Sequence, residues 1–140
     1  MTMTKRQRVL FLCTGNSARS QMAEALLRHI AGDQFEVFSA GTRPAGLNPN
    51  AVTAMSEIGI NIAESRSKSI DEFAGQQFEY VFTVCDSAKE SCPIFPGGGK
   101  RLHQSFEDPA AASADRQLVV FREVRDQIAE RLRRFVREES

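Results

Sequence analysis

Eight consecutive residues near the amino terminus combine groups that bind an oxyanion with a side chain that attacks it. The stretch reads Cys13-Thr14-Gly15-Asn16-Ser17-Ala18-Arg19-Ser20 and lies between an apolar run and a helical pattern. Between a strand and a helix, free backbone N–H groups and the positive end of the helix dipole converge on a bound anion. Gly15 and Asn16 tolerate a positive φ, which lets the loop curl around that anion. The expected anion-binding residues are therefore Thr14, Gly15, Asn16, Ser17, Ala18 and Arg19.

The residues at the two ends of this loop predict nucleophilic catalysis. The helix dipole and the guanidinium of Arg19 favour the thiolate form of Cys13, which is the reactive form of a cysteine. The planar guanidinium can also hold two oxygens of a tetrahedral oxyanion while the sulfur attacks its central atom. Ser20 is placed to donate a hydrogen bond to the sulfur. The alternative is that Cys13 only ends a buried strand and Arg19 only begins a helix.

The chain has two further cysteines, Cys85 and Cys92, which makes the total of three odd. A chain of this length needs no disulfides for its stability, so an odd count indicates catalytic or redox thiols. If residues 85–92 are helical, the two Cα atoms lie about 10 Å apart, whereas a disulfide requires about 4.4 to 6.8 Å. A bridge between Cys85 and Cys92 therefore requires the segment to unwind. The alternative is that both thiols are inert packing residues.

The elements that must position these residues alternate between strands and helices. Apolar or β-branched runs predict strands over residues 9–12, 35–40, 79–85 and 100–104. Helical spacing predicts helices over residues 20–31, 51–58 and 118–135, one helical turn over 70–73, and a short helix from a Ser87 to Glu90 capping box up to Pro93. The Arg and Glu residues of the last helix are expected to form a solvated face.

This alternation predicts an α/β fold with a single domain over residues 1–140, a doubly wound sheet of about four parallel strands flanked by helices. In such sheets ligands bind beyond the carboxyl ends of the strands. Cys13 and Cys85 both fall there.

Charge and composition exclude several other classes of function. Eighteen basic and eighteen acidic residues give a net charge of zero, which argues against broad capture of nucleic acid or of an anionic membrane. No apolar run approaches the ~18 residues of a membrane span, and no signal peptide is visible. The two histidines, His29 and His103, lack metal-ligand spacing. We therefore expect a cytoplasmic, monomeric protein without metal or organic cofactor.

The loop from Cys13 to Ser20 resembles the active-site signature of low-molecular-weight tyrosine phosphatases and of the arsenate reductases that share their fold. The segment from Cys85 to Cys92 resembles the redox segment of thioredoxin-coupled arsenate reductases, which the phosphatases lack. Asp108-Pro109 resembles the family's general-acid position, although Asp-Pro is also a common turn or helix cap. The resemblance covers nearly the whole chain.

The resemblance implies an oxidoreductase for arsenic detoxification. In the implied relay, Cys13 attacks arsenate, Cys85 and then Cys92 take over the disulfide, Asp108 acts as acid, and thioredoxin or another dithiol protein restores the thiols. Two alternatives remain open. One is a low-molecular-weight tyrosine phosphatase that uses Cys13, Arg19 and Asp108, and the other is a non-catalytic module that binds oxyanions or senses redox state.

Some relatives bind potassium near the loop, and Asn16, Glu24 and Ser39 match those ligands. Lys68 stands where those relatives have an acidic ligand. The resemblance therefore implies an ion pair between Lys68 and Glu24 in place of a potassium site.

Overall fold

The computed structural model describes residues 6–86 and 99–139. Cys92 and the helix expected from Ser87 to Pro93 lie outside these residues. The elements, in chain order, are β1 (Gln7–Cys13), α1 (Arg19–Ala31), β2 (Phe35–Gly41), α2 (Pro49–Ser56), the 3-10 helix η1 (Ile70–Phe73), β3 (Tyr80–Thr83), β4 (Lys100–His103), the 3-10 helix η2 (Pro109–Ala111) and α4 (Gln117–Glu139).

The described strands form one sheet of four strands in the order β2-β1-β3-β4, and every neighbouring pair is parallel. Val9 in β1 pairs with Val37 on one side and with Tyr80 on the other, so β1 is central. The predicted α/β fold with about four parallel strands is confirmed. The strand order reverses direction between β1 and β3, and such a switch point is where ligands bind in open α/β sheets.

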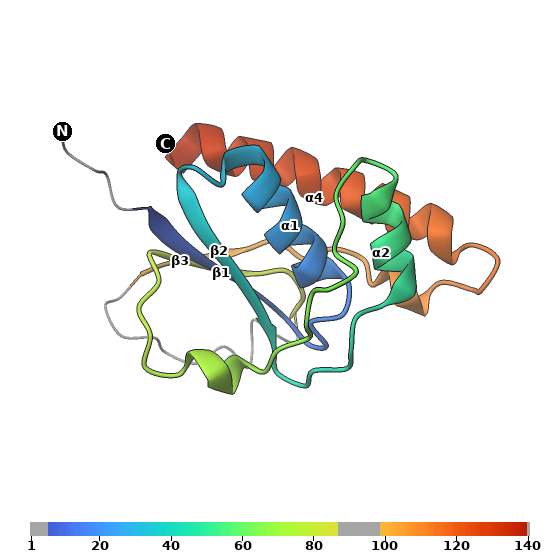
Figure 1. The fold of residues 1–140 in the computed structure, drawn as a ribbon, viewed down its shortest axis with the longest axis horizontal. Coiled ribbons are helices and arrows are strands. Elements are labelled where there is room, and N and C mark those ends of the chain that lie inside the picture. The colour runs from blue at the N-terminus through green and yellow to red at the C-terminus, as the bar shows by residue number, and fades with distance from the viewer. Residues whose placement is uncertain (1–5, 87–98, 140) are drawn as a thin grey trace.

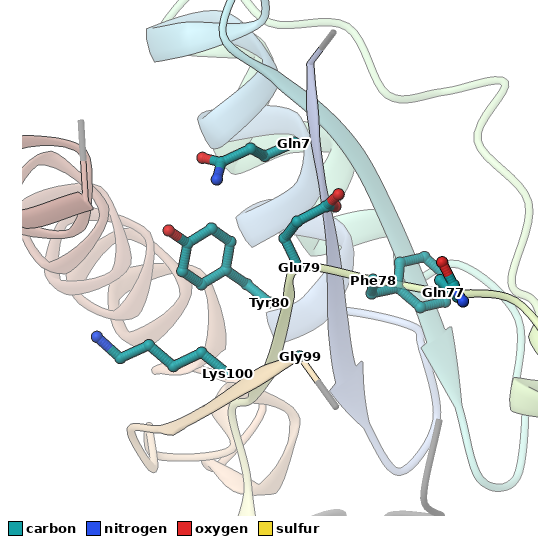
Figure 2. A pocket seen from close by; sticks show the side chains of 7 residues that line it. All are labelled: Gln7, Gln77, Phe78, Glu79, Tyr80, Gly99 and Lys100. Carbon is teal, nitrogen blue, oxygen red and sulfur yellow. The ribbon is translucent and has the colours of Figure 1, made fainter. Parts of the chain in front are cut away.

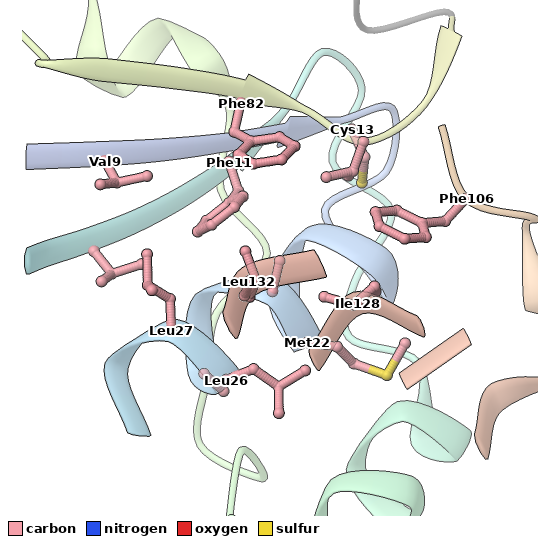
Figure 3. Packing of buried hydrophobic residues seen from close by; sticks show 14 of the residues in the cluster. Val9, Phe11, Cys13, Met22, Leu26, Leu27, Phe82, Phe106, Ile128 and Leu132 are labelled. Atoms are coloured by element: carbon pink, nitrogen blue, oxygen red, sulfur yellow. The ribbon is translucent and has the colours of Figure 1, made fainter. Parts of the chain in front are cut away.

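Helices and a long connection cover the two faces of the sheet. Figure 1 shows α1, α2 and α4 gathered on one side and the segment that carries η1 on the other. Val9, Phe11 and Cys13 alternate along β1 and point toward the helices, where Met22 of α1 and Ile128 of α4 meet them (Figure 3). The nucleophile predicted from the sequence therefore stands at the end of the helix-covered core.

The apolar face predicted for the last helix is buried from Phe121 to Phe135, whereas Leu118 at its start is only half-buried. Phe135 is 1% exposed, and its ring lies 5.1 to 6.0 Å from the rings of Phe35, Tyr80 and Phe82. The expectation that all arginines of this helix are solvated is wrong. Arg125 is buried, where its guanidinium donates to the carbonyl of Ala54 and to the carboxylate of Glu57, which tie α4 to α2.

Several helices and strands begin or end at other residues than the sequence predicted. The helix expected over residues 51–58 is α2, which begins at Pro49 because the Asn48 side chain accepts a hydrogen bond from the backbone N–H of Asn50 and Pro suits the first turn. The strand expected over 79–85 is β3, which ends at Thr83. The single turn over 70–73 and the edge strand β4 are observed, the latter ending at His103.

Candidate active site

The loop over residues 13–20 joins β1 to α1 and carries the predicted nucleophile. Cys13 is the last residue of β1 and only 2% exposed, and its Sγ lies 2.9 Å from the Ser20 Oγ in the first turn of α1. Within the described part of the chain, no group accepts a hydrogen bond from the backbone N–H groups of residues 14–18. These donors are therefore available to an anion bound over Cys13.

Asn16 organises the loop from within. It is completely buried and has a φ of 48°, a left-handed conformation that Asn tolerates better than most residues. Its amide donates to the hydroxyls of Ser20 and Ser39 at 2.8 and 2.9 Å, and its Oδ1 accepts from the Gln21 side chain and the Lys68 backbone. Of the two residues that tolerate a positive φ, Asn16 adopts one and Gly15 does not.

Residues outside the loop hold it in place, and the sequence assigned them no role. The Gln21 side chain also donates to the carbonyls of Asn16 and Arg66, and the Ser67 hydroxyl donates to the carbonyl of Gly15. Gly41 ends β2 so close to the loop that a Cβ there would lie 2.5 Å from the Thr14 carbonyl oxygen. Their partners lie up to 52 residues away along the chain, so no local pattern indicates these contacts.

Arg19 connects the loop to the predicted general acid. Its Nη1 donates to the Phe106 carbonyl at 3.1 Å, and its Nη2 lies 3.9 Å from Oδ2 of Asp108. The other carboxylate oxygen of Asp108 accepts from the backbone N–H of Ala110 and caps η2. Asp108 therefore caps η2 and also lies beside the guanidinium of Arg19, and its role as general acid stays a prediction.

Cys85 follows β3 at the same edge of the sheet as Cys13. Because β1 and β3 are neighbouring parallel strands, their carboxyl ends meet there. Cys85 is buried, and its Sγ lies 3.5 Å from the hydroxyl oxygen of Thr14, the residue next to Cys13. The structure thus brings five of the predicted catalytic residues to one place, whereas Cys92 lies outside the described residues; the five are Cys13, Arg19, Ser20, Cys85 and Asp108.

The residues that match potassium ligands form a network of hydrogen bonds and ion pairs that includes the ammonium group of Lys68. Ser39 donates to Glu24 Oε1 at 2.5 Å, and Asn16 donates to Ser39. The ammonium of Lys68 lies 3.6 Å from the same carboxylate oxygen of Glu24. Arg28 bonds the other oxygen at 2.7 Å. The ion pair expected between Lys68 and Glu24 is therefore present.

A family model described as low molecular weight phosphotyrosine protein phosphatase matches residues 8–139. The chain belongs to this phosphatase family. Its relatives include the arsenate reductase of Halalkalibacterium halodurans, which is 46% identical over 129 residues, 91% of this chain and 93% of that protein. The arsenate reductase of Bacillus subtilis (strain 168) is 45% identical with the same coverage.

Solved structures of arsenate reductases have the same fold. An arsenate reductase in the oxidized state superposes with a TM-score of 0.83 at 30% identity, over 96% of this chain and 99% of that one. The thioredoxin-dependent arsenate reductase of Corynebacterium glutamicum gives a TM-score of 0.77 at 31% identity, over 98% of this chain and 63% of that one. The phosphatase family and the kinship with arsenate reductases, both expected from the sequence, are thereby confirmed.

A cavity of about 330 Å³ opens at the amino ends of the strands, beside Gln7, Tyr80 and Lys100 (Figure 2), which is the edge opposite Cys13. A larger cavity of about 580 Å³ lies beside Phe106 and Glu107, between the segment after β4 and α4. Among residues 6–86 and 99–139, no cluster of His, Cys, Asp and Glu has the arrangement of a metal site. None of the helices seen in those ranges is long and apolar enough to cross a membrane.

Proposed function

We propose that this protein reduces arsenate to arsenite through a relay of three cysteines. Membership of the phosphatase family together with relatives of about 45% identity makes the chain an arsenate reductase, an oxidoreductase. The observation that carries the relay is the contact between Thr14 and Cys85, because it brings a second thiol to the loop that holds the nucleophile.

The first step is substitution at arsenic. The N–H groups of residues 14–18 and the guanidinium of Arg19 bind the oxyanion, and the thiolate of Cys13, which accepts a hydrogen bond from Ser20, attacks arsenic. A sulfur–arsenic bond forms and an arsenic–oxygen bond breaks. Asp108 protonates the departing oxygen, which leaves as water.

The second step transfers two electrons to arsenic. The thiolate of Cys85 attacks the sulfur of Cys13, and the electron pair of the sulfur–arsenic bond passes to arsenic, which becomes arsenite. A disulfide between Cys13 and Cys85 remains. The Thr14 hydroxyl, 3.5 Å from Cys85, supports the thiolate that makes this attack. Cys92 then attacks Cys85, frees Cys13 as a thiolate and forms the Cys85 to Cys92 disulfide.

A dithiol protein reduces this last disulfide, and we propose thioredoxin because a relative of the same fold is a thioredoxin-dependent arsenate reductase. The proposed compartment is the cytoplasm, where free thiols persist.

The test is anaerobic turnover of arsenate with thioredoxin and its reductase. The wild-type protein is expected to release arsenite repeatedly, Cys13→Ser none, and Cys92→Ser one equivalent per enzyme. Absence of thioredoxin-dependent arsenite release from the fully reduced wild-type protein would overturn the proposal.

Hydrolysis of aryl phosphates is the second candidate activity, and the proximity of the Asp108 carboxylate to the guanidinium of Arg19 favours it. Phosphate has nearly the shape and charge of arsenate, and hydrolysis needs neither Cys85 nor Cys92. A phosphatase would keep its full rate in Cys92→Ser. A non-catalytic module would show no turnover of either substrate.

A further inference from the structure

Three polar side chains form a chain of hydrogen bonds around Cys85. The His103 ring on β4 contacts the Thr83 hydroxyl through Nδ1 at 2.7 Å and the Asp86 carboxylate through Nε2 at 2.9 Å. A carboxylate only accepts, so Nε2 donates to Asp86. The Thr83 hydroxyl lies between Nδ1 of His103 and the carbonyl oxygen of Leu102, to which it donates at 3.4 Å. Thr83 lies two residues before Cys85 and Asp86 lies one after it, so a single imidazole bridges both sides of this cysteine.

The sheet fixes the chain immediately before Cys85. The backbone N–H of Val84 donates to the carbonyl of Leu12 at 2.9 Å, and the carbonyl of Val84 accepts from the backbone N–H of Phe106 at 3.1 Å. Thr83 itself is 4% exposed and pairs in register with His103 across β3 and β4. Beyond Cys85, the His103 ring contacts the side chain of Asp86, the last described residue before position 99.

The two ends of the hydrogen-bond chain differ in their access to water. The Thr83 end is buried, whereas the Asp86 side chain is 78% exposed. An exposed contact opens and closes readily, because water replaces the lost partner at small cost. In the proposed relay Cys85 faces Cys13 in one step and a different thiol in the next. A hydrogen bond between His103 and Asp86 that forms and breaks readily is compatible with this change.

We propose that His103 is a positioning residue for the second step of the reaction. By holding Asp86 it keeps the side chain of Cys85 directed toward Thr14 and therefore toward the sulfur of Cys13. Among the described residues, no hydrogen bond joins His103 to the loop over residues 13–20 or to the sulfur of Cys13 or Cys85. This inference rests on the proposed function, since it concerns the attack of Cys85 on Cys13.

The test separates the second step from the first. In a Cys92→Ser background, arsenite release in a single turnover measures formation of the Cys13 to Cys85 disulfide. Asp86→Ala and His103→Ala are expected to slow this release about five-fold, the effect of losing one hydrogen bond that orients the attacking group. Asp86→Asn keeps an acceptor for Nε2 and is expected to restore most of the rate.

Hydrolysis of p-nitrophenyl phosphate is the reference reaction, because it does not use Cys85. The matched control is His29→Ala, which removes the other histidine of the chain from an exposed position on α1. A selective loss of arsenite release in the Asp86 and His103 variants, with the aryl phosphate rate and the His29 control unchanged, supports the assignment.

Two results would overturn it. Single-turnover release at the wild-type rate in Asp86→Ala would show that the contact positions nothing, and a parallel loss of both activities would show a merely structural role. Failure of the wild-type protein to release arsenite at all would instead count against the proposed function.

Discussion

Replacement of Asn16 tests whether the anion-binding loop is held by hydrogen bonds or by backbone conformation. Asn16→Ala removes all four side-chain hydrogen bonds that this residue makes with Ser20, Ser39, Gln21 and Lys68. It also places Ala at a φ of 48°, where a Cβ is strained. Asn16→Gly removes the same hydrogen bonds and relieves that strain.

The free energy of unfolding that each variant loses can be worked out from the contacts of Asn16. Each buried hydrogen bond contributes roughly 1 kcal/mol net, so loss of the four bonds of Asn16 costs about 4 kcal/mol. Left-handed strain adds about 1 kcal/mol for Ala. Gly avoids the strain but loses about as much through the greater freedom of the unfolded chain. Both variants are therefore expected to lose about 4 to 5 kcal/mol and to lie within about 1 kcal/mol of each other.

Urea denaturation followed by circular dichroism measures the free energy of unfolding. The rate of arsenite release measures whether the anion-binding loop still supports the reaction. Ser39→Ala is the graded control. It removes one of the four bonds of Asn16 and the hydrogen bond that Ser39 donates to Glu24, and it is expected to lose about 2 to 3 kcal/mol. If Asn16→Gly unfolds at nearly the wild-type urea concentration while Asn16→Ala does not, conformation dominates and the hydrogen-bond argument is wrong.

Three further predictions concern stability, and each is checked by denaturation. Phe135→Ala is expected to lose about 3 to 5 kcal/mol, because its buried ring contacts three others, and a loss below about 1 kcal/mol would contradict this. A hydrogen bond from Arg122 lowers the pKa of Glu57, so its contribution is present at neutral pH and is lost as the pH falls through that lowered pKa. The denaturation midpoints of wild type and Glu57→Gln should therefore differ more at about pH 7 than at about pH 3, and an equal gap at both would refute it. Burial lowers the pKa of Arg131, whose Nε and Nη1 lack a hydrogen-bond partner in the described structure, so Arg131→Met should be at least as stable as wild type. A loss above about 1 kcal/mol would show that its cation–π contact with Phe82 outweighs the desolvation.

The parts of the fold and site that follow from local pattern were predictable. The apolar run that ends at Cys13 predicts a buried strand, and the spacing from Val124 to Phe135 predicts the face that α4 buries. The anion-binding loop was also predictable, because the type and order of its residues follow from the needs of an anion between a strand and a helix.

The contacts that join distant segments were not predictable, because the spacing of apolar and polar residues along the sequence does not indicate them. Gly41 looks like an ordinary strand end, although its missing side chain lets β2 pass close to Thr14. The charge of Arg125 indicates a solvent-exposed side chain, although its guanidinium donates to the carbonyl of Ala54 and to the carboxylate of Glu57. The role proposed for His103 depends on the register of β3 and β4, which the residue's own neighbours do not indicate.

The ammonium of Lys68 beside Glu24 gives the loop a positive charge that is part of the polypeptide. A free ion obeys mass action and leaves its ligands when its concentration in solution falls. A tethered ammonium has no such equilibrium with the medium, and a pair that is only 16% and 12% exposed is weakly screened by added salt. The pair between Lys68 and Glu24 is therefore expected to change little with the ionic composition of the surrounding solution.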